Sequence, residues 1–197
     1  MSADRDQVKQ ALDAELNSAA FVDYCPNGLQ VEGRTTISRL VSGVTASQAL
    51  IDRAIELNAD AVLVHHGYFW RGEDPCLVGM KGRRIRALIQ AEVNLFAYHL
   101  PLDNHATLGN NAGLGRALAM PSWRSLKATD LSYPVFTGQY EKSQSLSDIT
   151  AQLSRCLDRS LVTVGDDRKS ITPVAWCTGG GQGYIDDVSL IHISEPT

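Results

Sequence analysis

The 197-residue sequence has few cysteines, no excess of basic residues and no long hydrophobic run. Its four cysteines lie far apart without a Cys-x-x-Cys pattern, which argues against a disulfide scaffold and predicts reduced, mostly buried thiols. Eighteen Lys and Arg residues against 22 Asp and Glu residues give a net charge of −4, which disfavours nucleic acids and anionic membranes as partners. No segment approaches the roughly 20 apolar residues of a transmembrane helix. Because residues 1–16 are too polar for a signal peptide, we expect a cytoplasmic protein.

The sequence signatures of several common catalytic folds are also missing. We find no Gly-x-Gly-x-x-Gly or Walker loop for phosphates, and no Gly-x-Ser-x-Gly nucleophile turn. The hydrophobic fraction of 44% is that of an ordinary globular protein, and the length suits one large domain or two small ones. The chemistry must therefore be sought in less familiar arrangements of residues.

Hydrophobic patterns predict strands that alternate with helices, which favours an α/β fold with largely parallel pairing in the first half. Residues 23–33 are rich in turn formers and predict a loop, and residues 121–132 have weak periodicity and would join two subdomains. The predicted helices cover residues 8–16, 46–57, 80–91, 111–119 and 146–157, and the predicted strands cover 40–44, 61–64, 93–98, 133–137, 160–164 and 171–177.

Four of the five histidines follow the ends of two predicted strands. His65 and His66 follow one strand, and His99, Asp103 and His105 follow the next. Ligands bind beyond the carboxyl ends of strands in such sheets, and imidazole with carboxylate suits Zn²⁺, Mn²⁺, Fe²⁺ or Co²⁺. Adjacent histidines in a strand point to opposite faces, although a turn after them would let both reach a two-metal cluster bridged by the carboxylate. On spacing alone, a metal site and a set of hydrogen-bonded loop histidines are equally favoured.

Three other features allow a functional and a structural interpretation each. The basic cluster at residues 81–86 would receive a phosphate or form a solvated helix face, and a basic stripe there would favour nucleic acid after all. The glycine-rich segment 178–182 would cradle an anion or make a tight turn. Tyr68, Phe69 and Trp70 would stack on a base or wall the site.

Five segments together resemble the NIF-three-like (YbgI) family, whose members are also described as type 2 GTP cyclohydrolase I homologues. The resemblance is continuous from about residue 18 to 120, weak to about 172, and specific again to residue 186. The segments are DYCPNGLQVEG (23–33), VSGVTAS (41–47), ADAVLVHHGYFWRG (59–72), NLFAYHLPLDNHATLGNNAGLG (94–115) and VAWCTGGGQGYID (174–186).

The resemblance implies two linked α/β subdomains of layered helices and sheets, over residues 1–125 and 126–187, in a homo-oligomeric and commonly hexameric ring. It implies two divalent metal ions (Zn, Mn, Fe or Co) held by His65, His66 and Asp103. His99 and His105 lie in the same motif and are candidates for orienting these ligands. The function implied is that of a metal-dependent hydrolase of a nucleotide-like small molecule. The alternative is a non-catalytic metal-binding scaffold or regulatory protein.

The sequence departs from the family after Asp187. The family continues to a GHHATE-like segment whose His and Glu complete the metal site, whereas residues 188–197 read VSLIHISEPT and resemble no part of it. The second subdomain is therefore expected to be incomplete, with a foreign tail and weak metal binding. His192 and Glu195 have neither the spacing nor the context of replacement ligands.

Overall fold

A computed structural model describes residues 2–191, which form two compact units that divide between Leu102 and Asp103. We call them the first unit and the second unit. The mixed helices and sheets confirm the predicted α/β class. The subdomain limits at residues 125 and 187 stay predictions.

The first unit contains a four-stranded sheet in the order β2-β6-β5-β4. Strands β4, β5 and β6 run parallel, as predicted, while β2 pairs antiparallel with β6 at the edge. A separate two-stranded ribbon joins β1 and β3. The elements are β1 (Ala3–Asp4), α1 (Arg5–Leu16), the 3-10 helix η1 (Ser18–Ala20), β2 (Gly28–Val31), β3 (Thr36–Ile37), β4 (Leu40–Thr45), α2 (Gln48–Glu56), β5 (Ala61–His66), α3 (Gly79–Gln90) and β6 (Asn94–Ala97).

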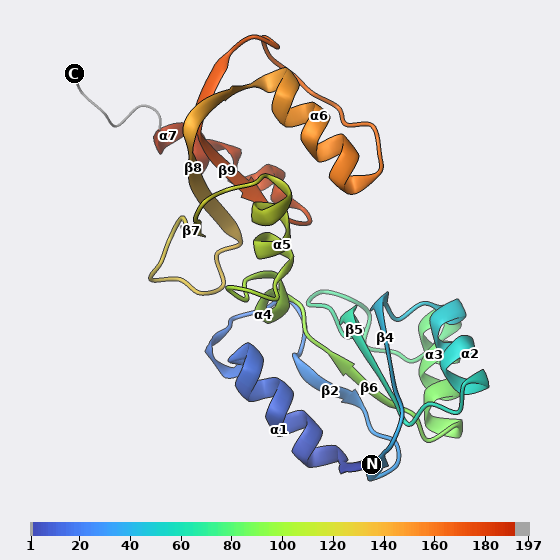
Figure 1. The fold of residues 1–197 in the computed structure, drawn as a ribbon. Helices are drawn as coiled ribbons and strands as arrows, with labels where there is room; N and C mark the ends of the chain where they lie inside the picture. Colours follow the sequence, from blue (N-terminus) through green and yellow to red (C-terminus); the bar gives the residue numbers. More distant parts are fainter. Residues whose placement is uncertain (1, 192–197) are drawn as a thin grey trace. The chain divides into compact units, whose positions relative to one another are not determined.

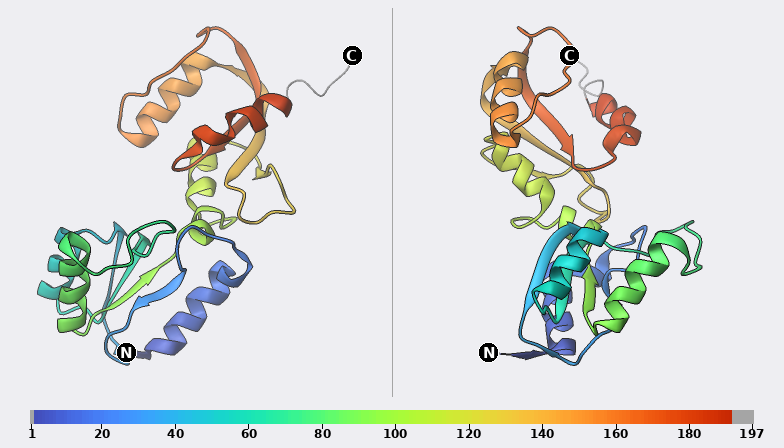
Figure 2. Two further views of the ribbon diagram at one scale, coloured as in Figure 1. Left: turned by 180° about the vertical axis from the view of Figure 1, so that it is seen from behind. Right: turned by 90° about the vertical axis from the view of Figure 1, so that its right-hand side faces the viewer.

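Helices cover both faces of this sheet, with α1 on one side and α2 and α3 on the other (Figures 1 and 2). Successive residues of a strand point to opposite faces. Val62 and Val64 of β5 therefore pack toward α2 and α3, while Ala61 and Leu63 pack toward α1. This double burial explains the continuous apolar run of β5, which places its polar end, the two histidines, at the rim of the sheet.

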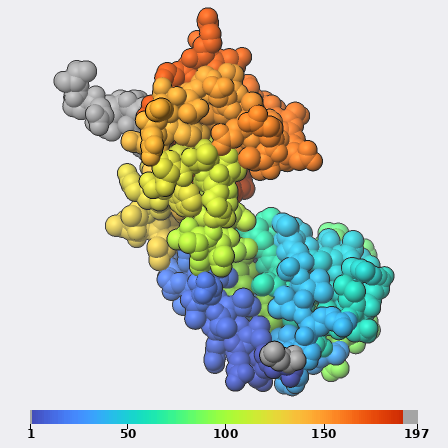
Figure 3. Space-filling model, in the orientation of Figure 1, coloured from blue at the N-terminus to red at the C-terminus, as the bar shows by residue number. Residues whose placement is uncertain are grey.

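The second unit has a three-stranded antiparallel sheet in the order β7-β8-β9. Its core gathers apolar side chains from α5, α6 and the sheet, and α6 lies at the surface of the unit (Figure 3). The short helix α4 (Leu100–Asp103) spans the division. The other elements are α5 (Asn110–Ala117), β7 (Arg124–Ser125), β8 (Val135–Ser145), α6 (Leu146–Leu157), β9 (Ser170–Cys177), the 3-10 helix η2 (Gly181–Tyr184) and α7 (Ile185–Ile191).

Several predictions from the sequence were wrong. Residues 23–33 are not wholly a loop, because 28–31 form the edge strand β2. The strand predicted at 160–164 is absent: Val162 and Val164 are 97% and 94% exposed, so their β-branched side chains have no sheet to pack on. The thiols are free, as predicted, but only Cys25 is buried, and Cys76 and Cys156 are exposed.

Two further observations concern predictions about the membrane and the tail. Within residues 2–191, no helix combines the length and the apolar character needed to cross a membrane. Residues 188–191 continue helix α7, whereas His192 and Glu195 lie outside the described residues.

Candidate metal centre

The end of β5 brings His65 and His66 to the rim of the first unit's sheet. His66 is still in register with Thr45 of β4, and His99 lies two residues after the end of β6 at Ala97. After the pair, Gly67 lies so close to its neighbours that an added Cβ would collide with Gln30 Oε1 and Ala97 Cβ. Only glycine fits at this position, and it allows the chain to turn away immediately behind the histidines.

Three histidine rings gather at this rim. The ring centroids of His65 and His66 are 4.3 Å apart, His99 lies 5.0 Å from His65, and His66 and His99 are 5.9 Å apart. One ring nitrogen from each residue lies within 4.8 Å of the others, which is close enough for a shared metal ion. We call this group the histidine cluster.

The Nδ1 atoms of all three rings have partners within the protein. His65 Nδ1 lies 3.1 Å from the Tyr98 carbonyl and His99 Nδ1 lies 2.8 Å from Asp23 Oδ1. Both partners only accept hydrogen bonds, so in a neutral ring each Nδ1 carries the proton and the lone pair is on Nε2. His66 Nδ1 pairs with Thr45 Oγ1 at 3.1 Å. A neutral imidazole whose other nitrogen is hydrogen-bonded is the usual metal-ligating form, so the cluster fits a divalent ion that prefers nitrogen ligands.

Asp23 orients His99 from a buried position, with only 2% of its side chain exposed. It accepts from the backbone N–H groups of Tyr24 and Leu100, from Asn27 and from His99. Burial acts to raise the pKa of Asp23, but these hydrogen bonds outweigh it and hold the pKa below its usual value. Both oxygens are thus committed to donors of the protein, which makes Asp23 a support for His99 rather than a metal ligand.

A second group of metal-ligating residue types combines Asp23, Cys25 and His99. Burial, and then the nearby Asp23 carboxylate, raise the pKa of the Cys25 thiol to about 12. Because a thiol binds metals as the thiolate, this second group is poorly suited to a metal. The histidine cluster is therefore the better site.

Asp103, the third predicted ligand, belongs to the second unit. It is 6% exposed and accepts hydrogen bonds from Asn110 Nδ2 at 2.8 Å and Thr178 Oγ1 at 3.2 Å. Thr178 follows β9, and its own N–H donates to Asn111 Oδ1. The structure thus brings His65 and His66 together, while the joining of Asp103 to them in one centre stays a prediction.

Other predicted features make structural contacts within the protein. His105 Nδ1 accepts the N–H groups of Thr107 and Leu108, which closes a turn. In the basic cluster, Lys81 pairs with Glu73 at 3.4 Å. In the glycine-rich segment, Gly181 donates its N–H to Gly179, as in a tight turn.

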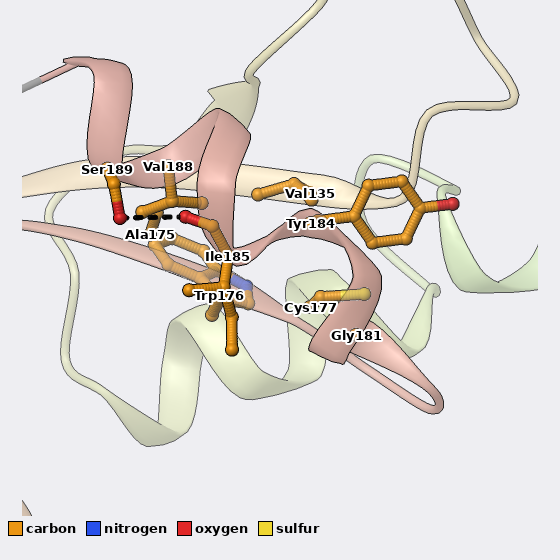
Figure 4. Close-up of a pocket in the computed structure, with 9 residues that line it drawn as sticks. All are labelled: Val135, Ala175, Trp176, Cys177, Gly181, Tyr184, Ile185, Val188 and Ser189. Carbon is orange, nitrogen blue, oxygen red and sulfur yellow. Dashed lines mark hydrogen bonds between the residues drawn. The ribbon is translucent and has the colours of Figure 1, made fainter. Parts of the chain in front are cut away.

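The second unit also contains a cavity of about 290 Å³ (Figure 4). Its walls are mainly apolar side chains from β8, β9 and α7, together with the thiol of Cys177. Burial and the Asp103 carboxylate raise the pKa of that thiol. Ser189 in the wall donates to the Ile185 carbonyl at 2.9 Å. This lining offers shape but few groups for chemistry, unlike the histidine cluster. The lining residues are Val135, Ala175, Trp176, Cys177, Gly181, Tyr184, Ile185, Val188 and Ser189.

Comparison with known proteins gives the same family along almost the whole chain. Residues 3–192 match the Duf34/NIF3 (NGG1p interacting factor 3) family. A "GTP cyclohydrolase 1 type 2 homolog" of Haemophilus influenzae is 47% identical over 181 residues, covering 91% of this chain and 72% of the relative. A protein of the same name from Pseudomonas aeruginosa is 49% identical over 174 residues, covering 88% and 69%.

Solved structures support the fold. "Protein ybgI, unknown function" aligns with a TM-score of 0.86 and 41% identity, covering 96% of this chain and 75% of that one. TTHA1606 from Thermus thermophilus aligns with a TM-score of 0.80 and 32% identity, covering 94% and 74%. The residue match, the identity to relatives and the shared fold agree, and the chain belongs to the Duf34/NIF3 family.

Proposed function

We propose that the chain binds two divalent metal ions (Zn, Mn, Fe or Co) and acts as a metal-dependent hydrolase of a nucleotide-like small molecule. The observation that carries this proposal is the histidine cluster, in which one ring nitrogen each of His65, His66 and His99 lies within 4.8 Å of the others. The name of the relatives, GTP cyclohydrolase 1 type 2 homolog, supports a nucleotide-like substrate.

In this proposal His65, His66 and Asp103 hold the metals. When bound there, divalent metal would supply a water of lowered pKa and would polarise the bond to be hydrolysed. Tyr98 O and Thr45 Oγ1 fix the planes of the His65 and His66 rings. Asn110 and Thr178 fix one carboxylate oxygen of Asp103. We include in the proposal a homo-oligomeric ring, for which the family resemblance is the only support.

Metal content tests the proposal directly. The purified chain is loaded with Zn²⁺ or Mn²⁺, desalted and analysed by mass spectrometry, beside His65→Ala and His66→Ala. Each substitution removes an imidazole ligand, so we expect affinity in a chelator competition to fall by more than about 100-fold, beyond the usual loss for a supporting residue. His105→Ala is the matched control, because its ring closes a turn.

Turnover of a panel of nucleotides by the metal-loaded chain then separates the two functions. Hydrolysis that requires metal and disappears in His65→Ala supports the enzyme. Stoichiometric metal without metal-dependent turnover favours the scaffold. A wild-type chain that takes up no metal, or one whose affinity does not depend on His65 and His66, contradicts the metal centre itself.

A further inference from the structure

Three aromatic residues lie in the turn that follows the histidine pair, two of them against the core and one beside the histidine cluster. Tyr68 is buried and donates its hydroxyl to the Ala46 carbonyl, and Phe69 packs against the same core. Phe69 has a φ of +65°, a left-handed conformation that a bulky side chain rarely adopts. Such strain persists only where the surroundings enforce it, often at functional sites. Here it accompanies a turn that brings Trp70 to the histidine cluster.

Trp70 forms a wall beside two of the three histidines. Its ring is half-buried and lies 4.9 Å from the His99 ring at an interplanar angle of 85°, and 6.0 Å from the His66 ring. Tyr24, which is 50% exposed, lies 6.4 Å from His99. The cluster is thus bordered by two aromatic side chains that are only partly covered by the protein.

Arg71 adds a fixed positive charge to this wall. Its backbone N–H donates to the Tyr24 carbonyl at 2.6 Å, and its Nη2 donates to the Asp23 carbonyl at 2.8 Å. The guanidinium carbon lies 5.7 Å from the Tyr24 ring centroid. Arg71 is exposed, and the ion pairs found among residues 2–191 do not include it. A guanidinium held against an aromatic face, with no carboxylate partner there, is suited to bind an incoming anion.

We propose that Trp70 and Arg71 determine substrate specificity, and that the substrate class is a planar heterocycle carrying a phosphate. Trp70 packs against the ring of the substrate, since every nucleobase has an aromatic face, and Arg71 binds the phosphate oxygens through its planar fork. The inference rests on the proposed function, which places the chemistry at the histidine cluster and names a nucleotide-like substrate. If Trp70 had only a structural role, its substitution would leave the affinities for the ring and for the phosphate unchanged.

Calorimetric titration with three probes separates the two contacts. GMP carries ring and phosphate, guanosine carries the ring alone, and ribose 5-phosphate carries the phosphate alone. We expect Trp70→Ala to lower the affinity for GMP and for guanosine by about tenfold or more. Its affinity for ribose 5-phosphate should stay within about twofold of the wild-type value. Arg71→Gln should show the converse pattern, with losses for GMP and ribose 5-phosphate only.

Tryptophan fluorescence locates the ring independently of any loss of affinity. GMP should quench the wild-type emission, Trp70→Phe should abolish the quenching while keeping measurable binding, and Trp123→Phe in the second unit is the matched control that keeps it. Circular dichroism of each variant confirms folding. Equal GMP affinity in wild type and Trp70→Ala, or no binding of GMP by the wild type, overturns the inference.

The proposed function and this inference fail in different ways. Metal content is measured on the same samples, and we expect Trp70→Ala and Arg71→Gln to retain the wild-type value. A chain that binds GMP through Trp70 but takes up no metal keeps the inference and contradicts the proposed metal centre. A chain that holds metal but does not bind GMP supports the proposed metal centre and contradicts the inference.

Discussion

The two units hold their polar residues by different means. In the first unit, β5 is enclosed by helices on both faces, and Ala61, Val62 and Val64 are at most 2% exposed. The histidines extend this buried strand, so apolar packing fixes the backbone that carries them. In the second unit, Trp176 is the one buried residue of β9, and Asp103 is held by the side chains of Asn110 and Thr178. Hydrophobic enclosure thus fixes the backbone of one part of the proposed site, where hydrogen bonds then orient the rings, whereas polar side chains position the other part.

The largest expected effects on the free energy of unfolding come from substitutions in the two cores. Phe96, which is fully buried among the residues that face α1, is the reporter for the first unit, and Phe136, 5% exposed, is that for the second. We expect Phe96→Ala to lower the free energy of unfolding by about 4 kcal/mol and Phe136→Ala by about 3 kcal/mol, because a tighter enclosure relaxes less around the cavity. Urea denaturation, with hydrogen exchange in β5 and β8 as the local readouts, measures both losses in the free energy of unfolding. A larger loss for Phe136→Ala would reverse the comparison.

A smaller effect is expected at Asp23, the buried carboxylate behind His99. Asp23→Ala removes the acceptor for several donors, and we expect a loss of about 2 kcal/mol in the free energy of unfolding at neutral pH. Since the folded pKa of Asp23 is lowered, this contribution is present above its unfolded pKa of about 3.9 and disappears as the pH falls through the folded value. Denaturation of wild type and variant as a function of pH measures the converging difference.

Asp60 is the matched control for this prediction. Burial acts to raise its pKa, but bonds from the Ser38 and Arg39 N–H groups and from Arg34 lower it, in a part of the first unit that does not carry the histidines. Asp60→Ala should cost a similar stability, whereas only Asp23→Ala should lower metal affinity, by about 10- to 100-fold. Equal metal affinity in both variants would show that Asp23 supports the fold alone.

Local patterns in the sequence predicted most of the first unit. The continuous apolar run of β5 and the hydrophobic pattern of α2 were sufficient to predict these two elements. Strand β2 was missed because Pro26, Asn27 and Gly28 indicate a turn, and its pairing with β6 depends on residues far along the chain. The prediction of a strand at 160–164 was wrong for a related reason, since local β propensity does not supply a partner strand.

The site was predictable in part. The His-His pair at a strand end signalled His65 and His66, but nothing in the spacing connects Asp23 with His99, which are 76 residues apart and meet only through the fold. Thr45, the partner of His66, lies 21 residues before it and meets it only through the pairing of β4 with β5. The sequence shows the aromatic run 68–70, but its division into two core residues and Trp70 depends on the left-handed turn at Phe69. Tertiary contacts, rather than local patterns, decide these roles.

The smallest expected effect compares two helix starts. Ser47 caps α2 by accepting the Leu50 N–H at 3.2 Å, and Ser145 caps α6 by accepting the Asp148 N–H at 3.1 Å. We expect Ser→Ala at either position to cost about 1 kcal/mol, and Ser→Gly only a few tenths, because the cap bond forms within one turn of helix. Hydrogen exchange of the first helical turns measures each loss. Equal losses of stability would show that the units differ in their cores and not at their helix starts. A much larger loss at Ser47 would extend the difference to the helix starts. Ser47 lies close to the histidine cluster, because Thr45, two residues before it in β4, is paired with His66 of β5.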